Sequence, residues 1–403
     1  MKLTIPLAAV AVALTSVSAA PVTTDLSTTA GFAGSLFGGL TSSFADLFSA
    51  RLVQTSPAEE PYWTTELGKQ LLWYRGVHFM DLTDTPDLGQ LNAARAQAAG
   101  STFKDSSKFP SSVEHGKHLK SVFKDISEDG PRMHLEKFTS FHTRYYKSET
   151  GRQSQAWLFK TVSDLVKDVA YIKVEEFPHP WGQNSILLKI KGSNATLTAS
   201  KGVTILGAHQ DSTNLFPFFA APGADDDGSG TVTIIEALRV LLKSNWRPES
   251  DVELHWYSAE EGGLLGSEAV AQAYERRATK IHAMLQQDMT AFVKAGTTET
   301  VGLVSDFVST PLTKFIGLLV DSYLDIGYTE TKLGYAGSDH ASWTKIGADS
   351  AFAIEATFEN SNLKRIHTTQ DTFDHPEFSF AHLMQFVRLS AAFVVELAGW
   401  SEA

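Results

Sequence analysis

The chain has 403 residues, of which 43% are hydrophobic, and its formal net charge is −12. This acidic balance argues against nucleic acids and anionic membranes as partners, because both bind basic protein surfaces. The chain contains no cysteine, so its stability must come from a packed core, from bound metal, or from both. Its length suits one large domain with an additional segment, or two domains.

The N-terminus has the pattern of a secretory signal peptide. Lys2 is followed by an apolar run at residues 5–14 and then by small residues, which predicts cleavage after Ala19 or Ala20. The apolar run is too short to span a bilayer comfortably, and we expect no membrane span in the rest of the chain. We therefore expect residues 1–19 to be a signal peptide and the protein to be secreted and extracellular.

Residues 20–86 are predicted to form a propeptide. Up to residue 60 this segment is rich in Ser, Thr, Gly and Ala and has no sustained apolar pattern, whereas Tyr62, Trp63 and Trp73 follow as aromatic anchors. A segment of this kind, directly after a signal peptide, is expected to dock on the domain behind it. An ordinary N-terminal extension is the alternative interpretation.

Residues 87–403 are predicted to form one α/β domain. After two helices within 133–167, strands are expected at 170–177, 185–191, 203–208, 252–257, 281–285, 301–304 and 351–356, and helices at 231–243, 267–277, 310–324 and 380–397. Strands that alternate with helices indicate a three-layer sandwich, in which helices flank a mostly parallel central mixed sheet. Asn194, in an Asn-Ala-Thr sequence, is a candidate glycosylation site and is expected on the surface.

An acidic turn, defined here as residues 223–230, has the sequence Gly-Ala-Asp-Asp-Asp-Gly-Ser-Gly. Its adjacent carboxylates Asp225, Asp226 and Asp227 repel one another, and a cation among them would relieve this repulsion. The alternative is a solvated turn whose last aspartate caps the following helix. Other potential metal ligands in the chain favour the cation.

Further potential metal ligands follow the predicted strands. They are His209 and Asp211, Glu260 and Glu261, Asp288, and His367 and Asp371. Each has a structural explanation when taken singly, as a buried histidine, a solvated turn or a cap, but the repetition at strand ends favours a site. Functional loops of such sheets lie at the carboxyl ends of the strands, so we expect these side chains to converge. Imidazole and carboxylate are ligands of zinc and similar divalent metals. The number of these side chains suits two metal ions about 3.5–4 Å apart that share a carboxylate and a water, with one glutamate free to accept a proton.

These stretches resemble motifs of the M28 metallopeptidases, in particular secreted fungal leucine aminopeptidases similar to the Vibrio (Aeromonas) aminopeptidase. The matching motifs are residues 207–213, 221–230, 258–262, 284–290 and 365–372, with a further match at 335–343. The resemblance extends over residues 87–400. It implies a secreted di-zinc aminopeptidase that hydrolyses N-terminal residues, chiefly leucine or other apolar residues, from peptides.

The resemblance also implies a role for individual residues. The implied metal ligands are His209 and Asp288 for one zinc ion, Glu261 and His367 for the other, and Asp226 as the bridge. Glu260 would be the general base that takes a proton from the metal-activated bridging water, and Tyr335 would help to stabilise the tetrahedral intermediate. Asp211 and Asp371 would support the ligands from behind.

A pocket for a leucine-like side chain is implied as well. Its lining would be Met289, Phe352, Ile354, Phe358 and Ile366, although ordinary core positions are a strong alternative for all five. The chain has Leu333 and Gly337 where the bacterial relative has a disulfide beside the tyrosine loop, so packing must hold that loop here. Expected partners are peptides with free N-termini and, before maturation, the chain's own propeptide; we expect a monomer.

Several alternatives remain. A serine hydrolase is disfavoured because no Gly-x-Ser-x-Gly motif follows a strand. A non-catalytic receptor-type domain and a glutaminyl cyclase are disfavoured because all five implied ligands and the base are present. A carboxypeptidase on the same scaffold would be distinguished by a substrate with a blocked N-terminus.

Overall fold

The computed structural model describes residues 46–98, 108–216 and 219–402. Ala50–Ala403 form one compact unit. The predicted signal peptide and residues 20–45 of the predicted propeptide lie outside the described residues.

An eight-stranded mixed sheet with the order β11-β10-β12-β9-β6-β8-β5-β4 is the centre of this unit. Its strands are β4 (Ile172–Phe177), β5 (Ser185–Ile190), β6 (Val203–His209), β8 (Val252–Tyr257), β9 (Ile281–Gln287), β10 (Val301–Val304), β11 (Tyr328–Thr331) and β12 (Ser350–Ile354). The neighbours β12, β9, β6 and β8 run parallel, whereas β4, β5 and β10 join through antiparallel pairs. Parallel strands need cover on both faces, and every residue of β6 and β8 is buried.

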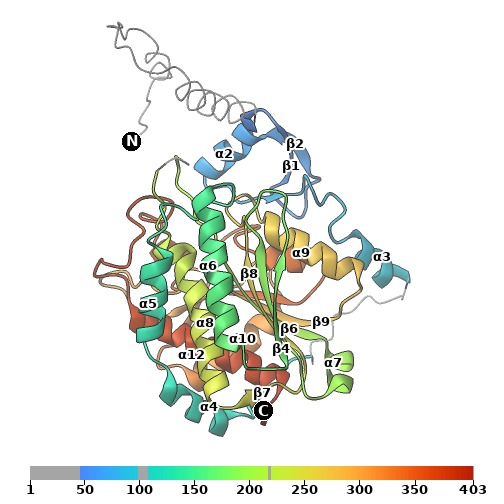
Figure 1. The fold of residues 1–403 in the computed structure, drawn as a ribbon. Helices are drawn as coiled ribbons and strands as arrows, with labels where there is room; N and C mark the ends of the chain where they lie inside the picture. The colour runs from blue at the N-terminus through green and yellow to red at the C-terminus, as the bar shows by residue number, and fades with distance from the viewer. Residues whose placement is uncertain (1–45, 99–107, 217–218, 403) are drawn as a thin grey trace, which may run out of the picture. The chain divides into compact units, whose positions relative to one another are not determined.

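Helices cover both faces of the sheet, which Figure 1 shows nearly edge-on. One face carries α4 (Gly116–Val122), α5 (Asp129–Phe138), α6 (Glu149–Val166), α8 (Gly230–Lys243), α10 (Thr310–Tyr323) and α12 (Phe380–Ala398). The other carries α9 (Leu265–Arg276) and α11 (His340–Lys345), with α3 (Gln90–Ala98) against α9. The short α7 (Ala195–Lys201) leads into β6. The predicted three-layer α/β architecture is confirmed.

Helix α12 is long and apolar enough to cross a membrane by length and composition, with a mean hydropathy of 1.3. However, 83% of that stretch is buried inside the protein, where α12 packs against α8 and α10. It is therefore the core helix of this layer. A core helix is apolar on all sides because other elements surround it.

Most predicted strands and helices lie within a few residues of their expected positions, and the differences concern short or exposed elements. Strand β11 was not predicted because three of its four residues are exposed and its sequence shows no apolar alternation. Helix α11 has six residues, which is too short for a helical period to show. The two-residue strands β7 (Trp246–Arg247) and β13 (Ser401–Glu402) pair with each other.

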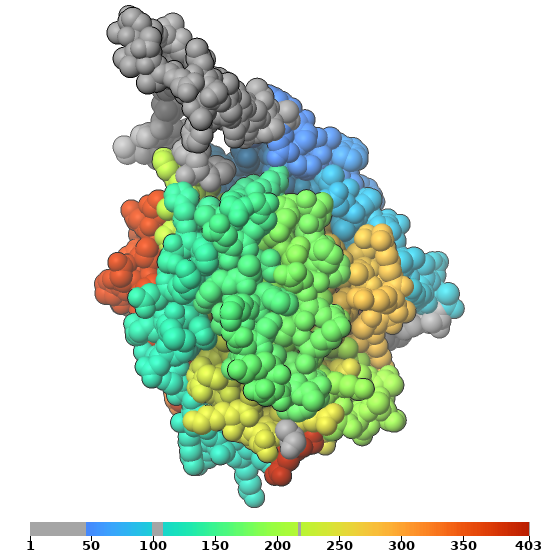
Figure 2. Space-filling model, viewed as in Figure 1, coloured from blue at the N-terminus to red at the C-terminus, as the bar shows by residue number. Residues whose placement is uncertain are grey.

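The described part of the predicted propeptide is folded. We call residues 50–86 the N-terminal segment; it contains β1 (Ala50–Gln54), β2 (Tyr62–Thr65), α2 (Glu66–Tyr74) and β3 (Met80–Asp81), with β1 between β2 and β3. Met80 and Leu82 are buried in the apolar cluster beneath α9 and α11. In Figure 2 this segment, in blue, lies directly against the coloured surface of the rest of the unit.

Candidate metal centre and substrate pocket

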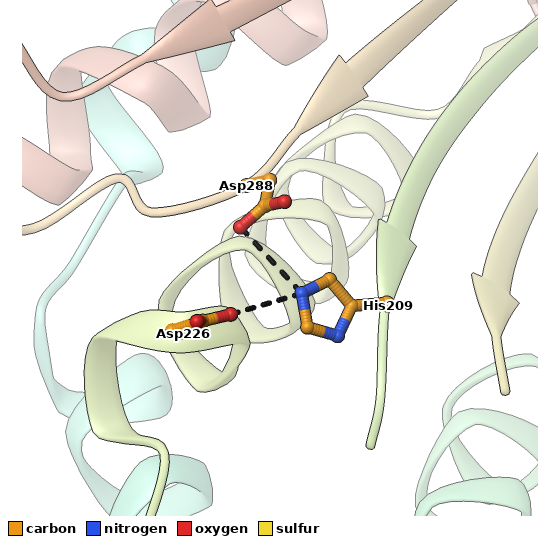
Figure 3. Close-up of side chains that lie close together, drawn as sticks. All are labelled: His209, Asp226 and Asp288. Atoms are coloured by element: carbon orange, nitrogen blue, oxygen red, sulfur yellow. Dashed lines mark ion pairs between the residues drawn. The ribbon is translucent and has the colours of Figure 1, made fainter. Parts of the chain in front are cut away.

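One group of potential metal ligands consists of His209, Asp226 and Asp288 (Figure 3). His209 is the last residue of β6, Asp288 directly follows β9, and Asp226 lies in the acidic turn before α8. The Nε2 atom of His209 lies 3.0 Å from Oδ1 of Asp226 and 3.6 Å from Oδ1 of Asp288. Because β6 and β9 are parallel neighbours, their carboxyl ends bring the histidine and Asp288 together.

A second group shares Asp226 and adds Glu261 and His367. The Nε2 atom of His367 lies 2.9 Å from Oδ2 of Asp226 and 3.0 Å from Oε2 of Glu261. Glu261 lies between β8 and α9, and His367 between β12 and α12. The structure thus brings all five residues that the resemblance implies as ligands around one carboxylate, whose two oxygen atoms face different groups.

The donor atoms of these groups fit a bound cation. Among the described residues, Nε2 of His209, Oδ1 of Asp288 and Oε1 of Glu261 are buried without a hydrogen-bond partner. A buried polar atom without a partner destabilises a protein by about 1–3 kcal/mol. A cation would satisfy these atoms and relieve the repulsion between the carboxylates, and imidazole with carboxylate is a donor set of catalytic zinc. The residues present therefore fit zinc.

Asp227 joins the loops that carry the ligands. Its carboxylate accepts hydrogen bonds from the N–H groups of His209 (3.1 Å), Gly230 (2.8 Å) and Met289 (3.2 Å). It therefore connects the ends of β6 and β9 with the first turn of α8. Asp227, the last aspartate of the acidic turn, thus binds an N–H group at the start of α8 as a helix cap does, while its neighbour Asp226 is a candidate metal ligand.

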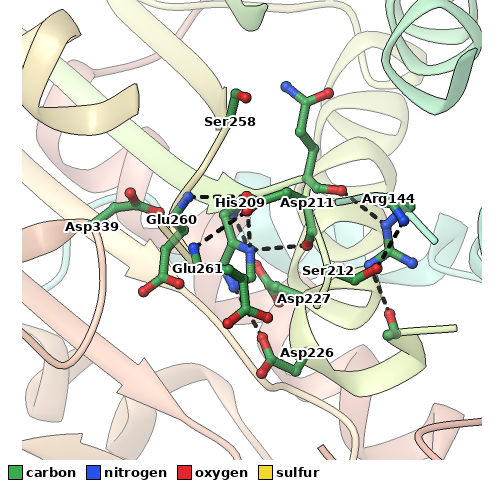
Figure 4. Close-up of polar contacts among 12 residues, drawn as sticks. Arg144, His209, Asp211, Ser212, Asp226, Asp227, Ser258, Glu260, Glu261 and Asp339 are labelled. Carbon is green, nitrogen blue, oxygen red and sulfur yellow. Dashed lines mark hydrogen bonds and ion pairs between the residues drawn. The ribbon is translucent and has the colours of Figure 1, made fainter. Parts of the chain in front are cut away.

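Asp211 connects a histidine loop with a glutamate loop (Figure 4). Its carboxylate accepts hydrogen bonds from the N–H groups of Glu260 (3.1 Å) and Glu261 (3.3 Å). Nδ1 of His209, on the side of the ring away from the ligand atom Nε2, is hydrogen-bonded to the main-chain carbonyl of Asp211 at 3.2 Å, and Oδ1 of Asp211 lies 3.5 Å from the same atom. A hydrogen bond from the second ring nitrogen to a main-chain carbonyl fixes the ring orientation of a metal-binding histidine.

Asp371 supports the acidic turn. Its carboxylate accepts hydrogen bonds from the N–H groups of Asp225 (3.0 Å) and Asp226 (3.1 Å). Asp225 in turn accepts a hydrogen bond from the Asn362 side chain at 2.9 Å, and burial raises the pKa of its carboxyl to about 6. Asp371 follows His367 in the sequence, and in the fold it holds the turn that carries the shared ligand.

Glu260 lines the same cavity as Asp226, Glu261 and Asp288. Burial raises the pKa of the Glu260 carboxyl well above its usual range, while the charge of a protonated His209 would lower it. A carboxyl group beside the ligand groups can accept a proton and return it, as acid–base catalysis requires. Of the two adjacent glutamates, Glu261 contacts His367 and Glu260 remains beside the ligand groups.

A cavity of about 450 Å³ opens onto both ligand groups. All five apolar residues implied for the substrate pocket line it, namely Met289, Phe352, Ile354, Phe358 and Ile366. They belong to one apolar cluster, which is small and separate from the main core. An apolar wall beside a few convergent polar groups is typical of a ligand site.

The N-terminal segment forms part of the wall of this cavity. It contributes Trp73, Tyr74, Gly76, Val77, His78 and Phe79 to the lining. The rings of Trp73 and His367 lie 4.5 Å apart, so an aromatic side chain of this segment contacts a candidate metal ligand directly. The aromatic residues of the sequence indicated a docking segment, but not its place at the cavity.

The same segment is bound to the loop that follows Glu260 and Glu261. Lys69, whose side chain is 4% exposed, donates hydrogen bonds to Oδ2 of Asp81 at 2.6 Å and to the carbonyl of Gly262 at 2.8 Å. The N–H group of Asp81 donates to the carbonyl of Gly263 at 3.0 Å. We call these contacts the Lys69 latch.

Tyr335, the residue implied to stabilise the intermediate, is also engaged by the N-terminal segment. Its hydroxyl donates to Oε1 of Gln54 at 2.9 Å and lies 3.0 Å from Sδ of Met80. Its neighbour Ala336 lines the cavity, whereas the Tyr335 hydroxyl is directed to the segment. The Tyr335 hydroxyl is therefore bound by the N-terminal segment, and Tyr335 is not among the described residues that line the cavity.

The tyrosine loop is held by a carboxylate where the bacterial relative has a disulfide. Asp306 accepts hydrogen bonds from the N–H groups of Leu333 (3.2 Å) and Gly334 (3.0 Å). Leu333 is 9% exposed and packs in the apolar cluster of the pocket. Packing of Leu333 therefore holds this loop as expected, and the hydrogen bonds to Asp306, which were not expected, hold it as well.

Two residues at the site were not among the predicted site residues, although Ser338 lies within the matching motif at 335–343. Ser338 donates a hydrogen bond to Oδ2 of Asp288 at 2.6 Å, and Arg144 binds the main chain beside the ligand loops. Arg144 lies between two helices, far from every motif in the sequence. Two further histidines, His255 and His340, are buried and belong to neither ligand group. His255 binds Glu253 within β8 at 2.8 Å, and His340 packs near Phe352.

Comparisons with known proteins point to one family. The family model described as Peptidase family M28 matches residues 185–392. Leucine aminopeptidase 1 of Phaeosphaeria nodorum is 49% identical over 360 residues, which cover 86% of this chain and 88% of the relative. Among solved structures, LapB from Legionella pneumophila has a TM-score of 0.72 at 25% identity, covering 91% of this chain and 97% of its own. The LapA aminopeptidase of the same organism has a TM-score of 0.74 at 24% identity, covering 88% and 95%.

Proposed function

The chain belongs to peptidase family M28. From this premise we propose that it is a zinc aminopeptidase, which removes N-terminal apolar residues from peptides with two zinc ions per chain. The observation that carries the proposal is the shared carboxylate of Asp226. One of its oxygen atoms lies 3.0 Å from the ligand atom of His209 and the other lies 2.9 Å from that of His367. Each histidine is accompanied by a second carboxylate, so two ions can be bound side by side.

Each zinc ion would have its own ligands in addition to the shared one. His209 and Asp288 would hold one ion, and Glu261 and His367 the other. Bound zinc supplies a Lewis acid that polarises the peptide carbonyl and lowers the pKa of water. Both groups lie at the cavity, so the scissile bond would be placed beside them when the substrate's first side chain enters the apolar pocket.

Glu260 would move the proton. It would accept a proton from the attacking water, whose oxygen forms the new bond to the carbonyl carbon. The same proton would then pass from Glu260 to the departing amino group as the C–N bond breaks. The products are a free amino acid and the shortened peptide. Tyr335 would donate a hydrogen bond to the carbonyl oxygen as its charge develops.

The proposal is tested with metal analysis and a pair of substrates. Mature protein should contain two zinc ions per chain and should hydrolyse a leucyl anilide, but not the same compound with an acetylated amino group. One zinc ion per chain would refute the two-metal arrangement. Faster hydrolysis of the acetylated compound, or of a C-terminal residue, would refute the aminopeptidase and favour a carboxypeptidase on this scaffold.

We also propose that residues 20–86 are a propeptide that keeps the enzyme inactive until it is removed. Three contacts of the N-terminal segment support this role: Trp73 lies against His367, Gln54 and Met80 engage Tyr335, and the Lys69 latch binds the loop after Glu261. We propose that these contacts restrict the entry of substrate and keep Tyr335 away from it. Proteolytic removal of the segment should therefore raise activity, and equal activity before and after removal would refute the role.

We propose in addition that the protein is secreted after removal of residues 1–19 and that it is a monomer. Asn194 is exposed at the start of α7, where its Oδ1 accepts a hydrogen bond from the N–H group of Leu197 at 3.0 Å. A glycan on its Nδ2 atom would leave this helix cap intact. Expression in a fungal host, followed by mass analysis of the medium before and after deglycosylation, tests secretion and glycosylation together.

A further inference from the structure

Arg144 is a fully buried arginine beside the metal centre. It lies in the connection between α5 and α6, it is 0% exposed, and its guanidinium stacks over the ring of Phe138 at 4.1 Å. Its main chain is fixed on both sides, because its N–H donates to Oγ of Ser212 at 3.1 Å and its carbonyl accepts from Nε2 of Gln183 at 2.9 Å. Both the position and the direction of the side chain are therefore determined.

The guanidinium of Arg144 binds two different segments of main chain (Figure 4). Its Nε donates to the carbonyl of Gln210 at 2.8 Å, immediately after the ligand His209. Its Nη2 donates to the carbonyl of Gly223 at 2.8 Å, and its Nη1 donates to the carbonyl of Pro222, both at the start of the acidic turn. One rigid, planar group thus connects the end of β6 with the turn that carries the shared ligand.

The charge of Arg144 interacts with the acidic groups of the centre. Burial lowers the pKa of Arg144 to about 10, while the carboxylates of Asp371, Asp211, Asp227 and Asp226 raise it, so the side chain is charged at neutral pH. The hydrogen bonds named above go to carbonyl oxygens rather than to a carboxylate. The positive charge is therefore held at a fixed place near several carboxylates without occupying the oxygen atoms that bind metal.

We propose that Arg144 is a positioning residue that sets the distance between His209 and Asp226 and thereby the zinc affinity of the centre. This inference rests on the proposed two-metal site. A lysine cannot replace the arginine, because an ammonium group cannot reach both main-chain segments with the fork geometry of a guanidinium. Loss of the connection lets the two ligand-bearing segments move apart, even though every ligand is still present.

Zinc affinity of full-length variants tests the proposal. Arg144→Lys and Arg144→Met are compared with wild type by competition against a chromophoric chelator, and we expect zinc to bind about 10- to 100-fold more weakly. Arg132→Lys and Arg132→Met are matched controls, because Arg132 stacks over Phe380 at 4.0 Å in the same way but lies exposed on α5. Both controls should bind zinc as wild type does.

A thermal measurement separates positioning from a general loss of stability. The rise in melting temperature on adding zinc should be smaller in Arg144→Lys than in wild type, because weaker binding stabilises the native state less. An equal zinc-induced rise, together with unchanged zinc affinity, would overturn the proposal even if the apo protein melts earlier. If Arg144→Met does not fold, Arg144→Lys decides the question. Failure of the wild-type chain to bind zinc would refute the proposed function instead, so the two failures are distinguishable.

Discussion

Replacement of Lys69 by methionine should activate the unprocessed enzyme. Lys69 and Asp81 are 4% and 1% exposed in their side chains and form the ion pair of the Lys69 latch. Methionine keeps most of the volume of the side chain but leaves the Asp81 carboxylate buried without its main partner. This penalty exists while the N-terminal segment is docked, because Asp81 becomes hydrated when the segment leaves.

The size of the effect follows from the remaining contacts. Removing one partner of a buried ion pair costs about 3–5 kcal/mol. Oδ1 of Asp81 keeps hydrogen bonds from the N–H group of Thr83 at 3.1 Å and from its hydroxyl at 2.5 Å, and Nε of Arg51 lies 3.9 Å from Oδ2. We therefore expect the docked state to lose about 2–4 kcal/mol, which is roughly a 30- to 700-fold increase in the undocked fraction. Activity of the full-length chain should rise by this factor, up to the activity of the processed enzyme.

The assay is hydrolysis of a leucyl anilide by full-length protein in the presence of inhibitors of other proteases, with mass spectrometry to confirm that the chain is intact. Lys160→Met is the matched control, because Lys160 pairs with Asp164 on the exposed face of α6 and its side chain is 74% exposed. It should leave the activity of the full-length chain unchanged. If intact Lys69→Met protein folds, binds zinc and is as inactive as wild type, the reasoning about the latch is wrong.

Three further predictions concern the centre itself. Glu260→Gln should lower kcat by about 10²- to 10⁴-fold while zinc content stays at two per chain, and retention of most activity would exclude the proton-transfer role. A strong chelator should abolish activity and zinc should restore it; full activity without metal would end the zinc mechanism. Gly223→Ala should lower the free energy of unfolding by about 1–3 kcal/mol, because φ is +55° there and a Cβ would lie 2.6 Å from the carbonyl oxygen of Asp226. Gly296→Ala is the control, because φ is +82° there and nothing lies within 4 Å of an added Cβ. Its loss of unfolding free energy should be smaller than that of Gly223→Ala, and equal losses would show that the close contact of the Cβ at position 223 has no effect on stability.

The positions of the candidate ligands were predictable because they depend on local features. Strands β6, β8, β9 and β12 are short apolar runs, and the residues that follow them lie at the strand ends wherever the strands are placed in the sheet. The parallel arrangement of those four strands then brings the loops together. His209, Glu261 and Asp288 could therefore be assigned to one site before their distances were known.

The supporting contacts were not predictable because they join residues far apart in the sequence. Arg144 binds the carbonyl of a residue 66 positions later, and Lys69 binds one 193 positions later. Neither the hydrophobic periodicity nor the residue spacing of the sequence indicates such a contact, because the contact depends on how helices and loops pack. The same holds for Tyr335, whose motif indicated a catalytic role but whose hydroxyl is bound by Gln54 and Met80.

The sequence by itself determined the α/β class, the ligand types and their attachment to strand ends, because apolar runs and the residues beside them act over a few positions. The tertiary structure decided that the two oxygen atoms of Asp226 face different histidines and that Asp227 and Asp371 hold the surrounding main chain. It also decided that the N-terminal segment forms part of the wall of the cavity. These features require side chains from distant parts of the chain to meet within hydrogen-bond distance, and packing of the whole domain is what brings them there.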